Sequence, residues 1–240
     1  AVHTAPTIAA DLVLLANDDG TLSAVDVASG ARRWTFQAAD VIRASPTLAG
    51  EHVVVASWDG MLHALTLDGR VCGSLDLGSV DQIDPVPARP TRMVADGDLV
   101  VLFDVSVRAV RAFTLSLVNF SGAERWCVRA GAAPDVAPVL FGDRVCWAED
   151  DRGLVTCVDA RSGETLWTQS AEDVPLPAAR FGNTLMVATR GGQLAAFDPS
   201  SSQVLWRLGT SVSFSSPPAV GEGIVYIGGT DRMLYALRLP

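Results

Sequence analysis

Residues 24–34 read Ala-Val-Asp-Val-Ala-Ser-Gly-Ala-Arg-Arg-Trp. The apolar residues before Asp26 are typical of a short β-strand, and the Asp-x-x-Ser-Gly segment that follows is typical of a tight turn. Trp34 then lies in a second short run. The segment therefore predicts a β-hairpin whose second strand carries a large aromatic side chain.

The same pattern recurs along the chain. Trp126, Trp167 and Trp206 each follow a further copy of the turn, and Gly73 stands in the tryptophan slot of the second copy. Most copies are about 40 residues apart, a period found in propeller blades and in arrays of paired helices. The repeat therefore limits the fold to these two architectures.

Strand signals favour the propeller. Each copy contains a short apolar, β-rich run, and the six runs are residues 12–16, 52–56, 99–103, 144–147, 184–189 and 224–227. The runs are nearly continuous in apolar residues, which indicates strands that are buried on both faces. A Gly-containing turn follows each run, and no segment shows a capped helical pattern. We expect one all-β domain over residues 1–240, a propeller of about six four-stranded blades with tryptophans wedged between the blades.

The last copy is shorter than the others. It stops at Pro240, before a tryptophan strand. Two interpretations are open: the sixth blade has three strands, or the natural protein is longer than these 240 residues. We favour the second interpretation.

Composition excludes several functions. The formal net charge is −9 and the sequence pI is about 4.7, which argues against a nucleic-acid partner and against binding to an anionic membrane surface. No apolar run approaches the roughly 20 residues of a membrane-spanning helix, so we expect no direct insertion into a membrane. His and Cys are too few and too scattered for a zinc site.

Residues 24–34 and the unit that runs from Ser45-Pro46 to Asp59-Gly60 resemble the tryptophan-docking repeat of the PQQ-like (pyrroloquinoline-quinone-like) β-propeller family. The resemblance covers essentially the whole chain and implies the propeller fold. Members of that family are either quinoprotein dehydrogenases, which carry PQQ and usually calcium on the ring axis, or non-catalytic modules for binding, sensing or scaffolding.

The non-catalytic branch fits better. The chain is shorter than the quinoproteins, lacks their adjacent-cysteine pair and offers no positions that map onto their cofactor ligands. We therefore expect no enzyme activity and no cofactor. One alternative is a small quinoprotein with PQQ and calcium; another is a docking domain appended to a larger enzyme or a Ser/Thr kinase. The resemblance slightly favours an extracytoplasmic or secreted location, and a cytoplasmic one if the domain is appended.

The predicted binding surface is the funnel face, which turns and inter-blade loops would line. Its candidate residues are Arg43, Trp58, Gln82, Arg108, Arg190, Phe214 and Arg232. The arginines can donate bidentate hydrogen bonds to carboxylate or phosphate, and Trp58 and Phe214 are expected to be exposed aromatic anchors. The expected partner is a protein or peptide, a small polar ligand, or an attached domain. The alternative is a solvated rim in which each Asp has its ordinary turn role.

Two further pairs have a structural and a functional interpretation. Asp150 and Asp151 could serve as acid and base, but turn carboxylates rarely have the water-poor surroundings that catalysis needs. Cys146 and Cys157 face each other if their hairpin closes at Asp151-Arg152. Such a pair can form a disulfide, but we favour two free buried thiols.

Overall fold

The structure is a computed structural model that describes residues 4–78, 87–116, 121–130, 137–221 and 223–238. Every regular element in these ranges is a β-strand, which confirms the all-β prediction. The described residues contain no helix long and apolar enough to cross a membrane. The chain divides into two compact units, Ala1–Arg129 and Ala130–Pro240, and each is described by itself. The prediction of a single domain over the whole chain stays a prediction.

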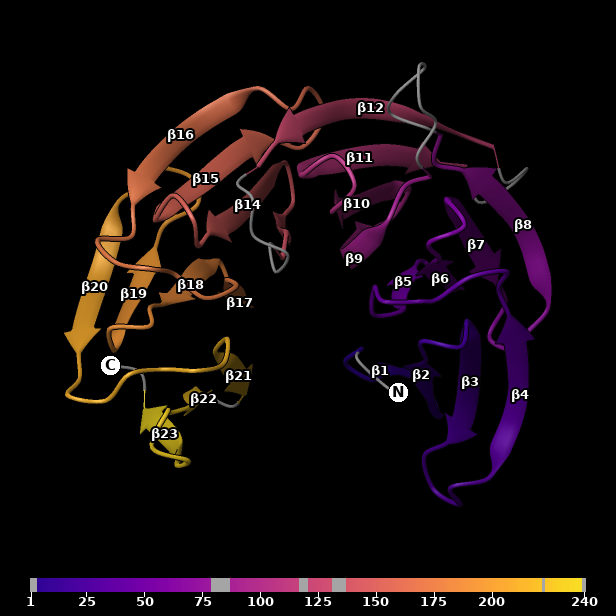
Figure 1. The fold of residues 1–240 in the computed structure, drawn as a ribbon, viewed down its shortest axis with the longest axis horizontal. Coiled ribbons are helices and arrows are strands. Elements are labelled where there is room, and N and C mark those ends of the chain that lie inside the picture. The colour runs from indigo at the N-terminus through magenta and orange to yellow at the C-terminus, as the bar shows by residue number, and fades with distance from the viewer. Residues whose placement is uncertain (1–3, 79–86, 117–120, 131–136, 222, 239–240) are drawn as a thin grey trace. The chain divides into compact units, whose positions relative to one another are not determined.

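The first unit contains three four-stranded sheets (Figure 1). The first sheet is β1 (Thr7–Ala9), β2 (Leu12–Ala16), β3 (Thr21–Asp26) and β4 (Arg32–Gln37). The second is β5 (Thr47–Ala49), β6 (His52–Ala56), β7 (Met61–Leu65) and β8 (Val71–Asp76). The third is β9 (Pro90–Asp96), β10 (Leu99–Asp104), β11 (Ala109–Leu115) and β12 (Gly122–Arg129).

The second unit contains two four-stranded sheets and one three-stranded sheet. The first of these is β13 (Val139–Phe141), β14 (Arg144–Glu149), β15 (Leu154–Asp159) and β16 (Thr165–Ser170). The next is β17 (Ala179–Phe181), β18 (Thr184–Ala188), β19 (Gln193–Phe197) and β20 (Val204–Gly209). The last is β21 (Ala219–Gly221), β22 (Ile224–Gly228) and β23 (Leu234–Arg238). Both interpretations of the last repeat give three strands within these residues, so each stays a prediction.

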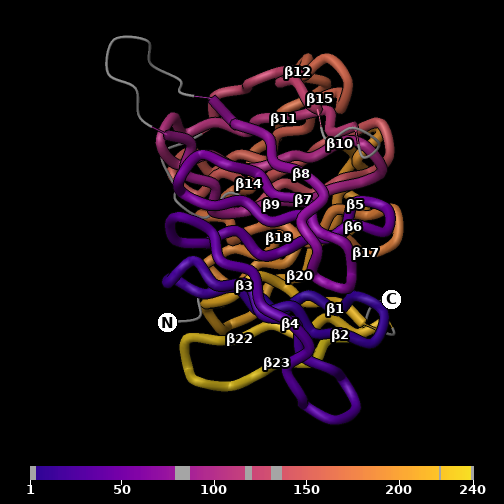
Figure 2. The backbone as a smooth tube through the Cα atoms, turned by 90° about the vertical axis from the view of Figure 1, so that its right-hand side faces the viewer, coloured from indigo at the N-terminus to yellow at the C-terminus, as the bar shows by residue number. Residues whose placement is uncertain are grey.

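Each sheet is an antiparallel meander in which strands consecutive in sequence are paired. Figure 2 follows the chain through the first of these sheets, from β1 to β4, at the indigo end of the colour scale. In the first sheet Leu14 pairs with Ala24, and Ala24 pairs with Trp34. A register shift directly after Ala24 marks a β-bulge, which increases the local twist of the outer strand. The small alanine opposite the indole leaves room for the ring on that face of the sheet.

The core lies between consecutive sheets. Leu14 and Ala24 of the first sheet are fully buried in one cluster with Val53, Val55 and Leu65 of the second sheet. The middle sheet of each unit packs on both faces: Val53 and Val55 of β6 lie in one core cluster and Val54 and Ala56 in another, and β18 is divided in the same way. This two-sided burial agrees with the nearly continuous apolar runs of these strands. The outer strands are more exposed.

The tryptophans join consecutive sheets. Trp34 donates its indole N–H to the Leu67 carbonyl, 2.8 Å away, in the turn between β7 and β8. Gly69 in that turn adopts φ +88°, and a Cβ there would lie 2.6 Å from the Trp34 ring. Trp167 makes the equivalent contact, a 2.9 Å hydrogen bond to the Pro199 carbonyl. The prediction that these tryptophans wedge between blades is confirmed at both positions.

Candidate functional site

The turn between β6 and β7 is built by residues 57–60. The Gly60 N–H donates to the Ser57 carbonyl at 3.2 Å, and the Asp59 carboxylate accepts the Met61 N–H at 2.9 Å. Gly60 adopts φ +84°, which glycine reaches without steric cost. Asp59 therefore has the ordinary turn role of the alternative interpretation, and its second carboxylate oxygen also accepts the Ala39 N–H at 3.2 Å.

Trp58 follows Ser57 in this turn and connects it to two other segments. Its backbone N–H donates to the Val41 carbonyl at 3.0 Å, and its indole N–H donates to the Pro90 carbonyl at 3.0 Å. The side chain is half-buried. The expectation of an exposed anchor was wrong, because the start of β9 covers one edge of the ring and satisfies its only polar group.

Two guanidinium groups lie against this indole. The Cζ atom of Arg43 is 4.8 Å from the ring centroid, and that of Arg89 is 5.5 Å from it. Both distances are in the range of cation–π contacts. We call these three residues, Arg43, Trp58 and Arg89, the Trp58 stack. The structure thus brings together two predicted residues and adds Arg89, which the sequence analysis missed.

The two arginines are held in different ways. The Arg43 side chain is 43% exposed and forms an ion pair with Asp18 at 3.3 Å. The Arg89 side chain is exposed, but its backbone N–H donates to the Asp104 carboxylate at 3.0 Å. The backbone that carries Arg89 is therefore fixed by a buried acid, while both guanidinium groups remain accessible to solvent.

An ion cluster whose members Asp104 and Arg111 are buried, and whose third member Glu124 is exposed, supports the Asp104 carboxylate. Asp104 pairs with Arg111 at 3.0 Å, and Arg111 also makes two hydrogen bonds, of 3.0 and 2.8 Å, to the Glu124 carboxylate. A further donor of Arg111 reaches the Leu77 carbonyl at 2.7 Å. Burial by itself lowers the pKa of Arg111, but its bonds to Glu124 and Asp104 outweigh that effect and raise the pKa above its usual value. Arg111 therefore stays protonated, and its bond to Asp104 holds the acid that fixes the loop next to the Trp58 stack.

The remaining predicted arginines do not join an aromatic ring. Arg190 is exposed and forms a 3.7 Å ion pair with Asp150. The Asp150 carboxylate therefore interacts with the turn that carries Arg190. Arg108 and Arg232 are exposed and adopt φ +54° and +68° at turn positions. Their exposure is compatible with binding a partner, but no neighbouring residue in the described structure points to a ligand for either arginine. Gln82 lies outside the described residues.

The expectation that Phe214 is an exposed anchor was wrong. Its side chain is 2% exposed and lies in a core cluster with Leu176, Met186 and Val225. Phe214 forms an isolated antiparallel bridge with Gly229, so the loop continues into the last sheet at this point. The large apolar ring is stabilised by burial and cannot contact a partner at the surface.

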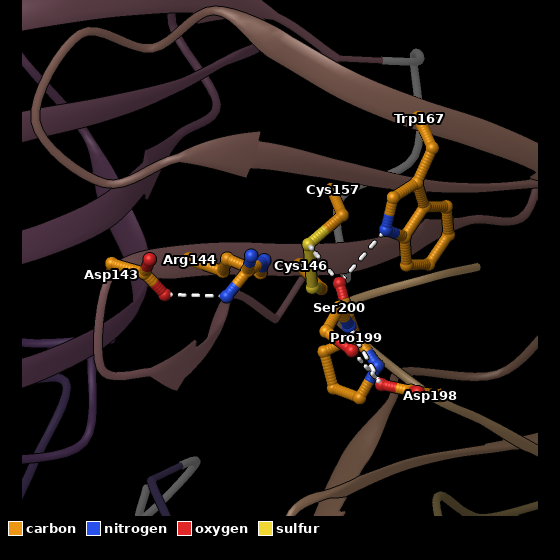
Figure 3. The surroundings of a disulfide bond; sticks show 8 residues. All are labelled: Asp143, Arg144, Cys146, Cys157, Trp167, Asp198, Pro199 and Ser200. Carbon is orange, nitrogen blue, oxygen red and sulfur yellow. Dashed lines mark hydrogen bonds and ion pairs between the residues drawn. A yellow bond between two sulfur atoms is a disulfide. The ribbon is translucent and has the colours of Figure 1, made fainter.

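Cys146 and Cys157 form a disulfide, which corrects the expectation of two free thiols. They are directly paired on β14 and β15, with Cα atoms 4.0 Å apart, and both are fully buried. Figure 3 shows them beside Trp167 and Pro199. The opposed register was predicted, but residue spacing carries no information on the redox conditions that decide whether the bond forms.

An open hollow of about 410 Å³ lies beside Trp34, lined by Asp11, Leu12, Arg33, Trp34, Leu67 and Asp68. Its charged side chains already have partners: Arg33 pairs with Asp11 at 3.4 Å and with Asp26, outside the lining, at 2.6 Å, and Asp68 accepts a hydrogen bond from Thr66. The hydrogen bonds from Ser29 and the Arg33 pair hold the pKa of Asp26 well below its usual range. The hollow therefore belongs to the docking turn and is a weaker candidate than the Trp58 stack.

The described residues do not fit a quinone–calcium centre. They contain no group of three or more His, Cys, Asp or Glu side chains that could hold a metal ion. The turn carboxylates of Asp19, Asp59 and Asp231 each accept the N–H of the residue two positions later. The bonds from Thr21 hold the pKa of Asp19 below its usual value. Each of these carboxylates is thus engaged by backbone N–H groups of its own unit.

Comparisons with solved structures agree with the propeller fold. A computationally designed protein, Ika8, matches all of this chain and 71% of its own, with a TM-score of 0.77 and 15% identity. The crystal structure of BamB from Moraxella catarrhalis matches 99% of this chain and 85% of its own, with a TM-score of 0.63 and 16% identity. At these identities the likeness shows the fold alone, an all-β propeller as predicted.

Sequence comparisons give the family. The outer membrane protein assembly factor BamB of Bordetella pertussis is 32% identical over 112 residues, and that of Burkholderia pseudomallei is 29% identical over 110 residues. The matched segments cover 46% and 45% of this chain and only 28% of each relative. A family model described as outer membrane protein assembly factor BamB matches residues 1–169 and 151–238. The chain, a PQQ-like repeat β-propeller, therefore belongs to the BamB family.

Proposed function

We propose that the chain is a non-catalytic, protein-binding scaffold that takes part in the assembly of outer membrane proteins, and that it binds a partner protein at the Trp58 stack. The names of its relatives, which are outer membrane protein assembly factors, support the process. The geometry of the Trp58 stack supports the binding surface that we propose and the acidic chemistry of the partner. The partner segment we assign to it is acidic and extended.

The observation that carries the proposal is the packing of two accessible guanidinium groups on one indole. A guanidinium donates paired hydrogen bonds that match a carboxylate, and it keeps this ability when its flat face lies on an aromatic ring. Tryptophan and arginine are also the residues that most often dominate binding energy at protein interfaces. An acidic segment meets both requirements, because its carboxylates would pair with Arg43 and Arg89 while its apolar side chains contact the ring.

The surface is organised before any partner arrives. Trp58 is held by backbone bonds to Val41 and Pro90, and the Arg89 backbone is held by Asp104. Groups that are already ordered lose less conformational entropy when they bind. This pre-organisation distinguishes the Trp58 stack from a solvated rim of mobile side chains.

The disulfide supports an extracytoplasmic location. Disulfides form and persist in oxidising compartments and are rare where cellular thiols are kept reduced. The Cys146–Cys157 bond is buried in the core of its unit, so it is an integral part of the folded protein. An envelope compartment outside the cytoplasm provides the required conditions.

The binding proposal is tested with a fluorescein-labelled peptide of alternating glutamate and valine, followed by fluorescence anisotropy. We expect the peptide to bind, and we expect Arg43→Gln and Arg89→Gln each to weaken it by about tenfold. Raising the salt concentration should weaken binding to the unchanged protein because the contact is between charges. A peptide with glutamine in place of glutamate should not bind.

Arg32→Gln is the matched control. Arg32 is an exposed arginine of β4 in the same unit, so its replacement removes the same charge away from the Trp58 stack. Equal affinity in all three variants would show that net charge, and not the Trp58 stack, attracts the peptide. In the bacterium that encodes the chain, the Arg43→Gln/Arg89→Gln double variant should also lower the amount of folded outer membrane protein. Normal amounts would contradict the assembly role.

A further inference from the structure

Asp18 has the position in the first sheet that Trp58 has in the second. Residues 17–20, between β2 and β3, read Asn-Asp-Asp-Gly, and residues 57–60, between β6 and β7, read Ser-Trp-Asp-Gly (Figure 1). In both turns the N–H of the glycine donates to the carbonyl of the first residue, at 3.1 and 3.2 Å. Asp18 and Trp58 are therefore equivalent residues of consecutive repeats.

The Arg43 guanidinium contacts both of these side chains. Its Nε atom is 3.3 Å from Oδ1 of Asp18, and its Cζ atom is 4.8 Å from the Trp58 ring centroid. The Asp18 side chain is 22% exposed, so part of it can be reached from solvent. A carboxylate thus lies directly beside the Trp58 stack, on the side of Arg43.

Arg89, the other arginine of the Trp58 stack, has no such acid. Its guanidinium lies 5.5 Å from the ring centroid and forms no ion pair or hydrogen bond with another side chain in the part of the chain that the structure describes. The charges of this surface are therefore asymmetric. A cation without an acidic partner among the described residues is followed by a cation that has one, and then by the acid itself.

Other acids near the Trp58 stack are used by backbone groups. Each accepts a backbone N–H, from Thr21, Val41, Met61 and Arg89 in the order Asp19, Asp40, Asp59 and Asp104. Asp18 differs because its carboxylate forms an ion pair with an arginine of the stack. An acidic side chain that approaches Arg43 therefore meets a like charge next to its target.

We propose that the Trp58 stack and Asp18 together select a partner segment in which a basic side chain lies next to the acidic ones. This inference rests on the proposed function and adds a third charge to its surface. The carboxylates of the segment pair with Arg89 and Arg43, and its basic side chain pairs with Asp18. A purely acidic segment would instead bring a further carboxylate close to Asp18, and such a like-charge contact weakens binding.

The test extends the glutamate–valine peptide by one residue at each end, with lysine in one version and glutamine in the other. Lysine at both ends can reach Asp18 in either chain direction. The measurement is fluorescence anisotropy at about 150 mM salt, where charges more than about 8 Å apart are largely screened. The unchanged protein should bind the lysine version about threefold more tightly, which is the size of an exposed ion pair. Asp18→Asn should lose this preference, and Asp18→Lys should reverse it.

Glu51→Gln is the matched control. Glu51 is exposed in the turn that precedes β6, whereas the Trp58 turn follows β6, so this variant removes the same charge at the other end of that strand. It should keep the preference for the lysine version. If both versions bind the unchanged protein equally, or if the preference survives in folded Asp18→Asn, the selectivity is overturned while the Trp58 stack remains the binding surface. Binding of neither version would contradict the proposed function as well.

A second measurement needs no variant. In NMR spectra of the unchanged protein, the lysine version should shift the signal of the Asp18 side-chain carboxyl carbon, and the glutamine version should shift it less. An Asp18 signal that responds equally to both versions would overturn the proposal, because the basic side chain would then not pair with Asp18.

Discussion

Trp34 and Trp58 lie in the same unit, and each donates its indole N–H to a carbonyl of the following sheet, at 2.8 and 3.0 Å. Their rings have different surroundings. Trp34 packs on the backbone of Gly69, in a turn that has no room for a side chain. Trp58 has the guanidinium groups of Arg43 and Arg89 against its ring.

The difference separates a contact that serves the fold from one that can serve a partner. The Trp34 ring is matched to a single glycine, and its polar group is satisfied within the chain. The Trp58 ring is anchored in the same way but carries two accessible charges. The same hydrogen bond from an indole N–H to a carbonyl thus joins two sheets at Trp34 and, at Trp58, holds an aromatic ring that carries two arginines.

The largest effect is expected at Trp34. Trp34→Ala removes the indole that joins the first two sheets, and we expect it to lower the free energy of unfolding by about 3 kcal/mol. Chemical denaturation followed by circular dichroism measures this change. A loss below about 1 kcal/mol would show that the docking contact does not stabilise the unit.

Gly69 gives a smaller effect with an internal control. Gly69→Ala places a Cβ 2.6 Å from the Trp34 ring at φ +88°, so it should cost about 2 kcal/mol. Gly30 has a similar φ of +70°, but a Cβ there would have no atom within 4 Å, and Gly30→Ala should cost about 1 kcal/mol from backbone strain alone. Equal losses in denaturant melts would contradict the close fit of Trp34 on Gly69.

His63 gives the smallest effect. It is 5.0 Å from Phe36 between ring centroids, and burial lowers its pKa although nearby Asp59 raises it. Because the folded pKa lies below the unfolded value of about 6.5, the unfolded chain takes up the proton first. Stability contributed by neutral His63 is therefore complete above that pH and is lost as the pH falls through the folded pKa.

Melts at pH 7 and pH 5 check this expectation. The unchanged protein should lose stability over this interval, and His63→Gln should lose less. An identical loss in both proteins would assign the pH dependence to other groups.

The repeat made most of the fold predictable. The spacing of Trp34, Trp167 and Trp206 and the apolar runs between them are local signals, so the sheets, their order and the docking contacts followed from sequence. Residues between the repeats were less predictable. The first strand of the third sheet begins at Pro90, so Arg89 occupies the loop position just before a strand. A residue that precedes proline often has such a position. The irregular spacing of this repeat nevertheless left the position of Arg89 unpredicted.

The candidate site was only partly predictable because exposure depends on tertiary packing. Arg43 and Trp58 were identified from turn and loop positions, which the repeat fixes. That Trp58 is half-buried depends on the Pro90 carbonyl, and that Phe214 is buried depends on its bridge to Gly229. Neither contact has a signal in the local sequence. For Cys146 and Cys157, the strand register was predictable from the hairpin, but the redox environment that decides whether the disulfide forms was not.

The most direct test of the account compares Trp58→Ala with Trp34→Phe in the acidic-peptide titration. Trp58→Ala should weaken binding of the glutamate–valine peptide by at least about tenfold while the protein remains folded, because the ring that holds both guanidinium groups is lost. Trp34→Phe, which keeps an aromatic ring at the docking turn, should bind the peptide as the unchanged protein does. Unchanged affinity in folded Trp58→Ala would contradict the assignment of the Trp58 stack as the binding surface.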